Sequence, residues 1–242
     1  MKLYIKEYIS YIDDGEIDIK KELKQKYKLD TRRQDRFIYL AVYGGQLLKQ
    51  KIEIKEDDEL YVTSGVGNAE IVQKTNTYMY KENQPLKLFD FINLLGNTTS
   101  YYIAKSLGIK GKNIFQISDN FTYTNTLISA YASILNSKKD VIICTIDLVS
   151  SPEEITKRVM GVKKSCEVQS SVNYQKLSLS KDGAIGMIEF GLDEETTCKA
   201  EDKPFETYTS YVINRALRDK KDLLHVEIFE DKKRTIKVKS FK

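Results

Sequence analysis

The segment NIFQISDNFTYTNTLISAYASILNSKKDVIICTI, residues 113–146, decides the fold class of this chain. Its residue pattern predicts a strand over 113–117, a helix over 122–135 and a second strand over 141–146. The second strand is apolar without interruption, which is typical of parallel strands that are covered on both faces. The segment therefore predicts a βαβ unit within a layered α/β fold.

The helix of this unit carries large apolar residues on one side and small residues on the other. Small side chains allow a second layer of structure to approach the helix closely. We therefore expect this helix to be packed on two sides, between sheets. The large residues are Leu127, Ile128, Tyr131, Ile134 and Leu135, and the small ones are Ser129, Ala130, Ala132 and Ser133.

Further elements are expected on both sides of the unit. Thr31 and Gln34 form a capping-box pattern, which predicts a helix over about 31–49. Residues 161–182 are polar and look irregular. Val226 and Ile228 alternate against Ile236 and Val238 across residues 230–233, which predicts a C-terminal β-hairpin with one solvent-exposed face. The other expected elements are strands over 3–12, 60–63 and 184–190 and a helix that ends at Gly108.

Length and composition are those of a globular chain. The 242 residues are 41% hydrophobic and 31% charged, which fits one large domain over 1–242. No apolar run approaches the length of a membrane span, and no secretory signal follows Met1, so we expect a cytoplasmic protein. The 39 Lys and Arg against 35 Asp and Glu leave a charge of +4, which does not indicate nucleic-acid binding.

The chain contains one histidine, His225, and three cysteines at wide spacing. This composition predicts no metal site of the usual Cys and His type and no disulfide framework. Any Ser/His or Cys/His pair has to use His225, which we expect at the surface or edge of the last hairpin. Cys144, inside the apolar strand, is expected to be a small buried hydrophobic residue.

Several segments, in this order, resemble the β-ketoacyl synthases of the thiolase-like superfamily. Their order and spacing carry the resemblance, which spans about residues 30–190. The segments are 31–37 with Leu40 and Ala41 (the first core helix), 61–67 (a strand and glycine turn), 93–97 with Ala104 and residues 108–111 (the approach to the nucleophile strand), 117–118 (leading into the elbow at 118–122), 140–143 (the strand after the nucleophile helix) and 181–183 (before the last core strand).

The resemblance implies a layered αβαβα thiolase-like fold, with one ketosynthase half and a C-terminal hairpin extension. It also places Phe121 where condensing enzymes carry their cysteine nucleophile, at an elbow whose helix N-terminus lowers a thiol pKa. Elongating members use two histidines, and this chain has one. No catalytic residue and no cofactor are therefore expected. The residues flanking Phe121 are Ser118, Asp119, Asn120 and Thr122, and Asp119 and Asn120 also suit helix N-caps.

A ketosynthase half without the elbow cysteine resembles the chain-length-factor-like subunits of aryl-polyene and type II polyketide systems. The resemblance implies that this chain pairs with an active ketosynthase and shapes its acyl-chain cavity. Pairing is expected through strand 113–117, with segment 89–97 reaching across, and Arg32, Arg33 and Arg36 are expected to contact an acyl carrier protein. The expected interface and tunnel residues are Phe89, Phe91, Asn93, Leu94, Asn97, Asn113, Phe115 and Ile117.

Other hypotheses remain open at this point. Phe121 also suits an ordinary core aromatic, and the chain also suits a free-standing binding module for an acyl group, a carrier protein or a peptide. An acyltransferase that uses Ser118 or Cys166 is the weakest hypothesis, because no base is visible to activate either residue. Nucleotide binding at Gly65 and Gly67 is disfavoured, since Glu70 stands where the third glycine of that motif belongs.

Overall fold

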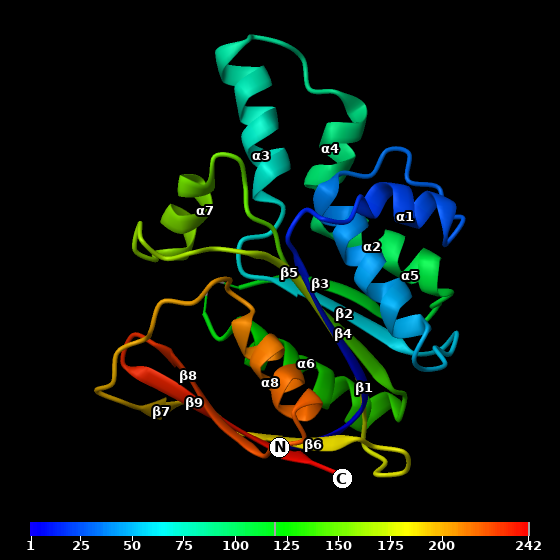
Figure 1. Cartoon of the computed structure of the whole chain (residues 1–242), viewed down its shortest axis with the longest axis vertical. Coiled ribbons are helices and arrows are strands. Elements are labelled where there is room, and N and C mark those ends of the chain that lie inside the picture. Colours follow the sequence, from blue (N-terminus) through cyan, green and yellow to red (C-terminus); the bar gives the residue numbers. More distant parts are fainter. Residues whose placement is uncertain (119, 242) are drawn as a thin grey trace.

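The computed structural model describes residues 1–118 and 120–241, and its frame is one bent sheet (Figure 1). The strand order is β3-β2-β4-β5-β1-β6-β9-β7, with β8 on the other edge of β9. β3, β2 and β4 are parallel, and all other pairs are antiparallel. The strands are β1 (Lys2–Asp13), β2 (Glu59–Ser64), β3 (Asn113–Ile117), β4 (Val141–Asp147), β5 (Ser170–Ser178), β6 (Gly186–Phe190), β7 (Glu194–Glu195), β8 (Leu223–Phe229) and β9 (Lys232–Ser240).

Helices cover both faces of this sheet. α2 and α5 pack on one face, and α6 and α8 pack on the other. None of the helices in the described part of the chain is long and apolar enough to cross a membrane. The helices are α1 (Ile19–Gln25), α2 (Arg36–Lys49), α3 (Ala69–Asn76), the π-helix η1 (Thr77–Lys81), α4 (Leu88–Leu94), α5 (Gly96–Leu107), α6 (Thr122–Ser137), α7 (Glu153–Met160) and α8 (Tyr208–Arg218).

The predicted βαβ unit is confirmed as β3, α6 and β4. β2 lies between the two strands of the unit, so the crossover skips one position. Every residue of β4 is buried, as the apolar run predicted, and Cys144 is fully enclosed. These three parallel strands end at the same edge of the sheet, where the candidate site lies.

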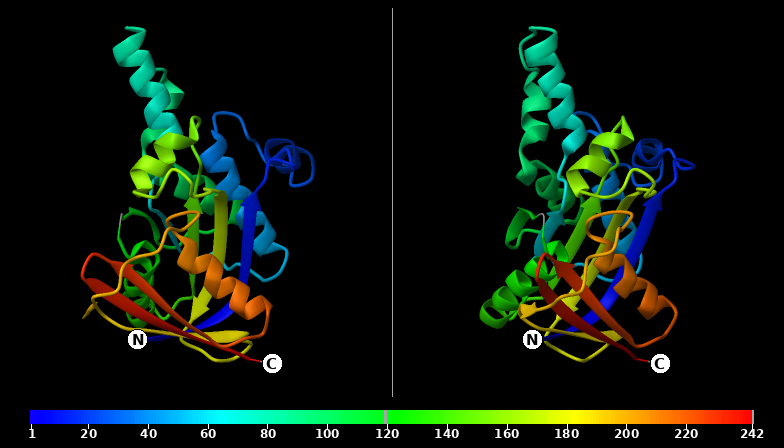
Figure 2. Two further views of the ribbon diagram at one scale, coloured as in Figure 1. Left: turned by 60° about the vertical axis from the view of Figure 1, so that its left-hand side comes forward. Right: turned by 90° about the vertical axis from the view of Figure 1, so that its left-hand side faces the viewer.

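α6 is packed on two sides, but by two arms of one sheet. Leu127 and Ala130 join the cluster that includes Tyr61 and Ile143 of the central strands. On the other arm, the Phe190 ring of β6 meets the Tyr131 ring edge-on at 6.1 Å. Figures 1 and 2 show β6, β8 and β9 curling beneath α6 and α8. The predicted apolar face was partly wrong, because Leu135 is 42% exposed whereas the small residues Ala130 and Ser133 are buried.

The first core helix begins later than predicted. Asp35, not Thr31, is its N-cap, and the Asp35 carboxylate accepts a hydrogen bond from the Ile38 N–H at 3.0 Å. Arg33 has a φ of 68°, which no α-helical residue adopts, so the chain cannot be helical from 31 onward. Gln34 instead donates to the Asp30 carbonyl.

The segment predicted as irregular, 161–182, contains β5, a fully buried central strand. Two of its polar side chains, Gln175 and Lys176, find partners far away in the sequence, which sequence periodicity does not reveal. Gln175 Nε2 donates to Asn214 Oδ1 at 2.7 Å, and Lys176 Nζ lies 2.7 Å from the Asp58 carboxylate. A polar residue that is hydrogen-bonded inside the protein is tolerated in a core. The polarity of this segment was therefore not evidence for a loop.

The C-terminal hairpin is confirmed, but its predicted register was wrong. The turn is formed by Glu230 and Asp231, so His225 faces Ile236 and Val226 faces Thr235. A hairpin shifted by an odd number of positions exchanges its two faces. His225 therefore lies on the inner face with Ile236, whereas Val226 points outward.

A buried carboxylate ties the site edge together. Asp147, at the end of β4, accepts hydrogen bonds from Ser64 Oγ and the Gly65 N–H at 3.1 Å and from the Thr207 N–H and hydroxyl at 2.7 and 2.8 Å. Burial raises the pKa of Asp147, and these hydrogen bonds oppose that rise. The carboxylate links the ends of β2 and β4 to the start of α8.

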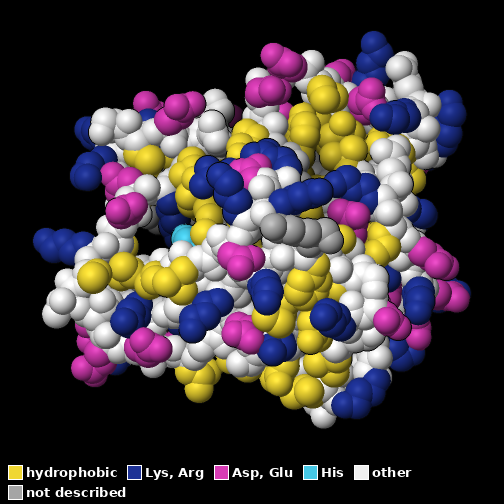
Figure 3. Space-filling view, turned by 60° about the horizontal axis from the view of Figure 1, so that its bottom comes forward, with side chains coloured by type: hydrophobic (Ala, Val, Ile, Leu, Met, Phe, Trp, Pro, Cys, Tyr) yellow, Lys and Arg dark blue, Asp and Glu magenta, His cyan; other side chains and the backbone are white. Residues whose placement is uncertain are grey.

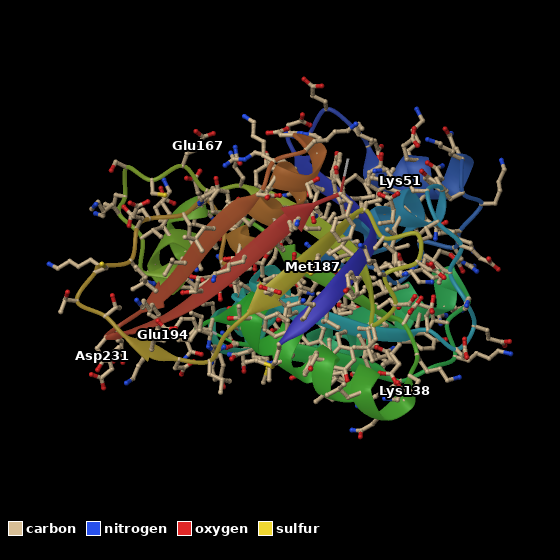
Figure 4. The ribbon with its side chains drawn as sticks, turned by 90° about the horizontal axis from the view of Figure 1, so that it is seen from below. Lys51, Lys138, Glu167, Met187, Glu194 and Asp231 are labelled. Atoms are coloured by element: carbon tan, nitrogen blue, oxygen red, sulfur yellow. The ribbon has the colours of Figure 1, made fainter. Side chains whose placement is uncertain are left out.

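We expect Asp147→Asn to destabilise the fold by about 3 kcal/mol, because the new amide hydrogens face donors that then lose their acceptor. Urea denaturation measures the change. The matched control, Asp231→Asn at the exposed hairpin turn (labelled in Figure 4), is expected to change stability by less than about 0.5 kcal/mol. Equal stability of the two variants would contradict this role for Asp147.

Candidate functional site at the strand-to-helix elbow

The elbow between β3 and α6 lies at the carboxyl edge of the parallel strands. Phe121 caps α6 with φ 42° and ψ 35°, a left-handed conformation that is uncommon for a bulky residue. Ser118 Oγ donates to the Asn120 carbonyl at 2.6 Å, and Asn125 Nδ2 donates to the same carbonyl at 2.9 Å. Thr122 Oγ1 donates to the Ser118 carbonyl at 2.6 Å. Side chains on both sides thus fix this turn.

The N-cap of α6 is not one of the two residues expected there, Asp119 and Asn120. Phe121 holds the cap position, so Asn120 lies one residue before it and takes part in the turn instead. Asp119 lies outside the described residues. The predicted flanking residues Ser118, Asn120 and Thr122 are therefore brought together, and each is engaged in holding the elbow.

The Phe121 side chain points into the protein and is 9% exposed. The Arg234 guanidinium lies 4.3 Å from the centre of its ring, and the Phe229 ring meets it edge-on at 6.3 Å. Arg234 Nη1 also donates to Thr124 and Asn125 of α6, and Arg234 Nε pairs with Asp193. The hairpin β8–β9 therefore packs against the elbow through Phe229 and Arg234 and holds Phe121 in place.

A cavity of about 440 Å³ opens beside Phe121. His225 and Thr209 line it, and the His225 Nε2 lies 3.1 Å from Thr209 Oγ1. Burial lowers the pKa of His225. His225 does lie on an edge strand, as predicted, but it is half-buried. Residues 198–203, 208–209 and 225–229 line one cavity with Phe121, which no local pattern in the sequence indicates. Figure 3 views the face with the hollow beside the histidine.

The strand expected to pair with a partner is an edge strand. Among the described strands β3 pairs only with β2, so its other edge is open. Ile117, at its end, is 57% exposed. Phe115 is half-buried, and its ring meets Phe37 at 6.4 Å and lies where a side chain on Gly96 would otherwise stand. Asn113 is exposed.

α4 exposes its apolar residues and buries its polar ones. Leu88, Phe89 and Phe91 are exposed, and Phe91 is 50% accessible to solvent. Asp90 and Asn93 are buried instead, with Asp90 2.8 Å from Lys74 Nζ and Asn93 Nδ2 donating to the Arg33 carbonyl. α3 and α4 project from the body of the molecule (Figure 2). Of the other expected interface residues, Leu94 is half-buried and Asn97 is exposed.

The three expected carrier-contact arginines do not act as one group. Arg32 pairs with Asp30 at 2.8 Å, and Arg36 pairs with Asp13 at 2.8 Å. The Arg33 guanidinium lies 4.5 Å from the centre of the Phe89 ring, so it holds α4. Arg32 and Arg33 line one surface cavity with Lys105, and Arg36 lies outside that lining.

The alternative nucleophiles have partners that are not bases. Ser118 bonds to Asn120 and Asn125, and the Cys166 thiol contacts the Glu167 and Lys203 carbonyls. Burial raises the pKa of the Cys144 thiol to about 12. Within residues 1–118 and 120–241, no group of three or more His, Cys, Asp or Glu side chains is placed to hold a metal ion.

Solved structures share this fold. No family model and no curated protein matches the sequence. The ketosynthase ApeO in complex with its chain length factor ApeC from Xenorhabdus doucetiae is similar at a TM-score of 0.68, over 98% of this chain and 99% of that chain, with 10% identity. The ishigamide ketosynthase/chain length factor is similar at 0.60 with 13% identity, over 73% of this chain and 53% of that chain.

A third similar structure is the type II polyketide synthase complex AntDE:AntF, with its acyl carrier protein and hexaketide-bound ketosynthase. Its TM-score is 0.54 at 9% identity, over 78% of this chain and 63% of that chain. This chain thus spans about half to two thirds of the length of the second and third structures. These likenesses confirm the predicted ketosynthase-like, thiolase-type α/β fold.

The lowered pKa of His225 makes stability depend on pH. As the pH falls through about 6.5, the unfolded chain binds a proton at His225 before the folded chain does, so wild-type stability falls. Urea denaturation from about pH 7.5 to about pH 5 should show wild type losing stability relative to His225→Gln. The imidazole of this one histidine should titrate below about 6.5 in a nuclear magnetic resonance titration. A midpoint above that value would contradict the burial of His225.

Proposed function

We propose that this ketosynthase-fold chain is a non-catalytic subunit that pairs with an active ketosynthase and shapes its acyl-chain cavity. The carrying observation is Phe121, buried in a left-handed conformation at the strand-to-helix elbow. By resemblance, this is where condensing enzymes carry their cysteine. A phenyl ring has no nucleophilic atom, and its place under Arg234 leaves no thiol at the helix N-terminus.

The surroundings of the elbow support the same conclusion. A condensing enzyme needs bases or donors aimed at the thioester, and the one histidine of this chain bonds to Thr209. Cys144 is enclosed in the core, and its raised pKa keeps the thiol protonated. The fold is therefore retained while the groups for decarboxylative condensation are replaced.

Two surfaces support pairing. The open edge of β3 offers unpaired backbone groups to a strand of a partner, and an exposed edge of this kind is normally covered in a stable assembly. The exposed apolar residues of α4 need cover for the same reason. ApeO and ApeC, and the ishigamide pair, are complexes of a ketosynthase with a chain length factor, which supports a partner of that type here.

The exposed position of α4 supports the cavity-shaping role. Phe89, Phe91 and Leu94 lie on the segment proposed to reach the ketosynthase, so their volume limits the space for a growing acyl chain. Arg32 and Arg33 remain a proposed contact for an acyl carrier protein, at the surface cavity they share with Lys105.

Pairing through β3 predicts that Ile117→Lys breaks the complex. The chain, tagged and purified from its native source, should bring a full-length ketosynthase in a one-to-one ratio by native mass. Because a lysine at Ile117 places an unpaired charge in the covered edge, we expect it to lower the recovered ketosynthase by at least about tenfold. Leu135→Lys, an exposed change on the outer side of α6, is the matched control. Recovery of this chain alone would contradict the proposal.

The cavity-shaping role predicts a change in product length. With the ketosynthase partner present, Phe91→Ala should give longer products, since removal of the ring frees space in the acyl cavity. The control is Tyr80→Ala on η1, which is more exposed than Phe91. Mass spectrometry of the products distinguishes the two. An unchanged product for Phe91→Ala and for matching alanine variants at Phe89 and Leu94 would refute the gating role.

A further inference from the structure

We infer that the outer face of the sheet arm formed by β6, β9 and β8 binds an amphipathic helix with acidic flanks from another protein. This inference goes beyond the proposed function and does not rest on it. β3 and this arm lie at opposite ends of the strand order, so a ketosynthase on β3 and a helix on this arm do not compete for one surface.

The outer face of the arm carries no helix. Its inner side chains, among them Ile188, Ile236 and Val238, belong to the cluster that packs against α6 and α8. The central strands, in contrast, have helices on both faces. Figure 4 looks at the arm from below, and no helix of the described chain crosses in front of β6, β8 or β9. The arm therefore presents one bare face of the sheet.

The register of the strands decides which side chains stand on this outer face. Lys237 of β9 lies opposite Leu224 of β8 and opposite Glu189 of β6. The next residue of β9, Val238, is buried, so Lys237 and its two neighbours point outward. By the same alternation the outer face also carries Val226, Ile228, Lys233, Lys239, Met187 and Lys2.

The outer side of β8 carries an apolar row. Leu224 is 66% exposed and Val226 is 39% exposed, and Ile228 continues the row as a half-buried residue. At a rise of about 3.4 Å per residue, the row is about 13 Å long. Apolar residues at positions i, i+4 and i+7 of an α-helix span about 10.5 Å. The apolar stripe of a single helix therefore matches the length of this row.

Unmatched positive charge lies beside the apolar row. Lys237 and Lys239 of β9 are exposed, and neither forms an ion pair with another described residue. The acidic residues on this face are already paired, Glu189 with Lys2 at 3.1 Å and Glu194 with Lys233 at 3.4 Å. Acidic residues on the flank of a bound helix would complement the two free lysines, so the charge of this face favours an acidic partner.

Two other occupants fit this face less well. A two-fold pair of this chain would bury the same patch from both copies and so double its unmatched positive charge. An anionic membrane suits the lysines, but it would also meet Glu189 and Glu194, which point to the same side. A helix that lies on the β8 row and contacts only the lysines of β9 avoids both carboxylates. The occupant is therefore a helix of another protein.

Helix binding is tested by titrating the full chain into two labelled peptides and measuring fluorescence anisotropy. Both peptides are alanine-based helices with leucine at positions i, i+4 and i+7. One has glutamate on both flanks of this stripe, and the other has lysine there. Because their apolar surface is the same, a difference in affinity measures the contribution of charge. Nuclear magnetic resonance of the methionine methyl groups locates the peptide, since Met187 lies on this face (Figure 4) and Met187→Leu assigns its signal.

We expect the acidic peptide to shift the Met187 signal and to bind at least about tenfold more tightly than the basic peptide. Lys237→Glu combined with Lys239→Glu should reverse this preference. Leu224→Asp should weaken the acidic peptide by at least about tenfold, because binding would then bury an unpaired charge. The matched control, Lys138→Glu at the end of α6 (labelled in Figure 4), should bind as wild type does. Equal urea midpoints would show that all variants are folded.

Four results would each overturn the inference. They are equal binding of the two peptides, acidic binding that survives the double lysine change, binding that leaves the Met187 signal unmoved, and no binding of the acidic peptide at millimolar concentration. Tighter binding to phosphatidylserine vesicles than to the acidic peptide would also overturn it, since a lipid surface would then be the occupant. None of these results depends on a ketosynthase, so this inference and the proposed function fail separately.

Discussion

The guanidinium of Arg234 lies 4.3 Å from the centre of the Phe121 ring, and this contact joins the two halves of the site. Phe121 belongs to the βαβ unit, and Arg234 belongs to the C-terminal hairpin. The cation is held in turn by Asp193, Thr124 and Asn125, so it is buried with its hydrogen bonds made. A buried cation without such partners would be costly. The Phe121 ring, held by this contact, fills the elbow and lines the cavity beside β8.

The bent sheet explains why a chain of this length encloses α6. Its central strands and its β6–β9 arm cover two sides of the helix, and Leu127 and Tyr131 pack in one cluster with residues of both arms. This arrangement leaves open strand edges, whose unpaired backbone N–H and C=O groups are unfavourable. One edge, along β1, is capped internally by Lys51 and Asn214. The edge of β3 is not capped by the described side chains, and it leads to the proposed ketosynthase partner.

Elements with local signals were predictable. The apolar run of β4 and the apolar period of α6 depend on residues next to each other in sequence, and the order of short segments was enough to indicate the ketosynthase fold. β5 was missed because Gln175 and Lys176 are satisfied by Asn214 and Asp58, which lie far away in sequence. The hairpin register failed because the turn at Glu230 is shorter than the charged segment suggested. The same error placed His225 on the wrong face of the hairpin and hid the cavity that it lines, since the register decides which face a residue occupies. The clamp on Phe121 depends on a contact across more than a hundred residues, for which the sequence carries no local signal.

The central claim is that the elbow of this chain carries no acyl group. The most direct test is to incubate the purified complex with an acyl thioester and to measure the intact mass of each subunit. We expect an acyl adduct on the partner ketosynthase and an unmodified mass for this chain. An adduct on this chain, mapped to Ser118, Cys166 or Cys198, would contradict the account and make the chain an acyl-transferring enzyme.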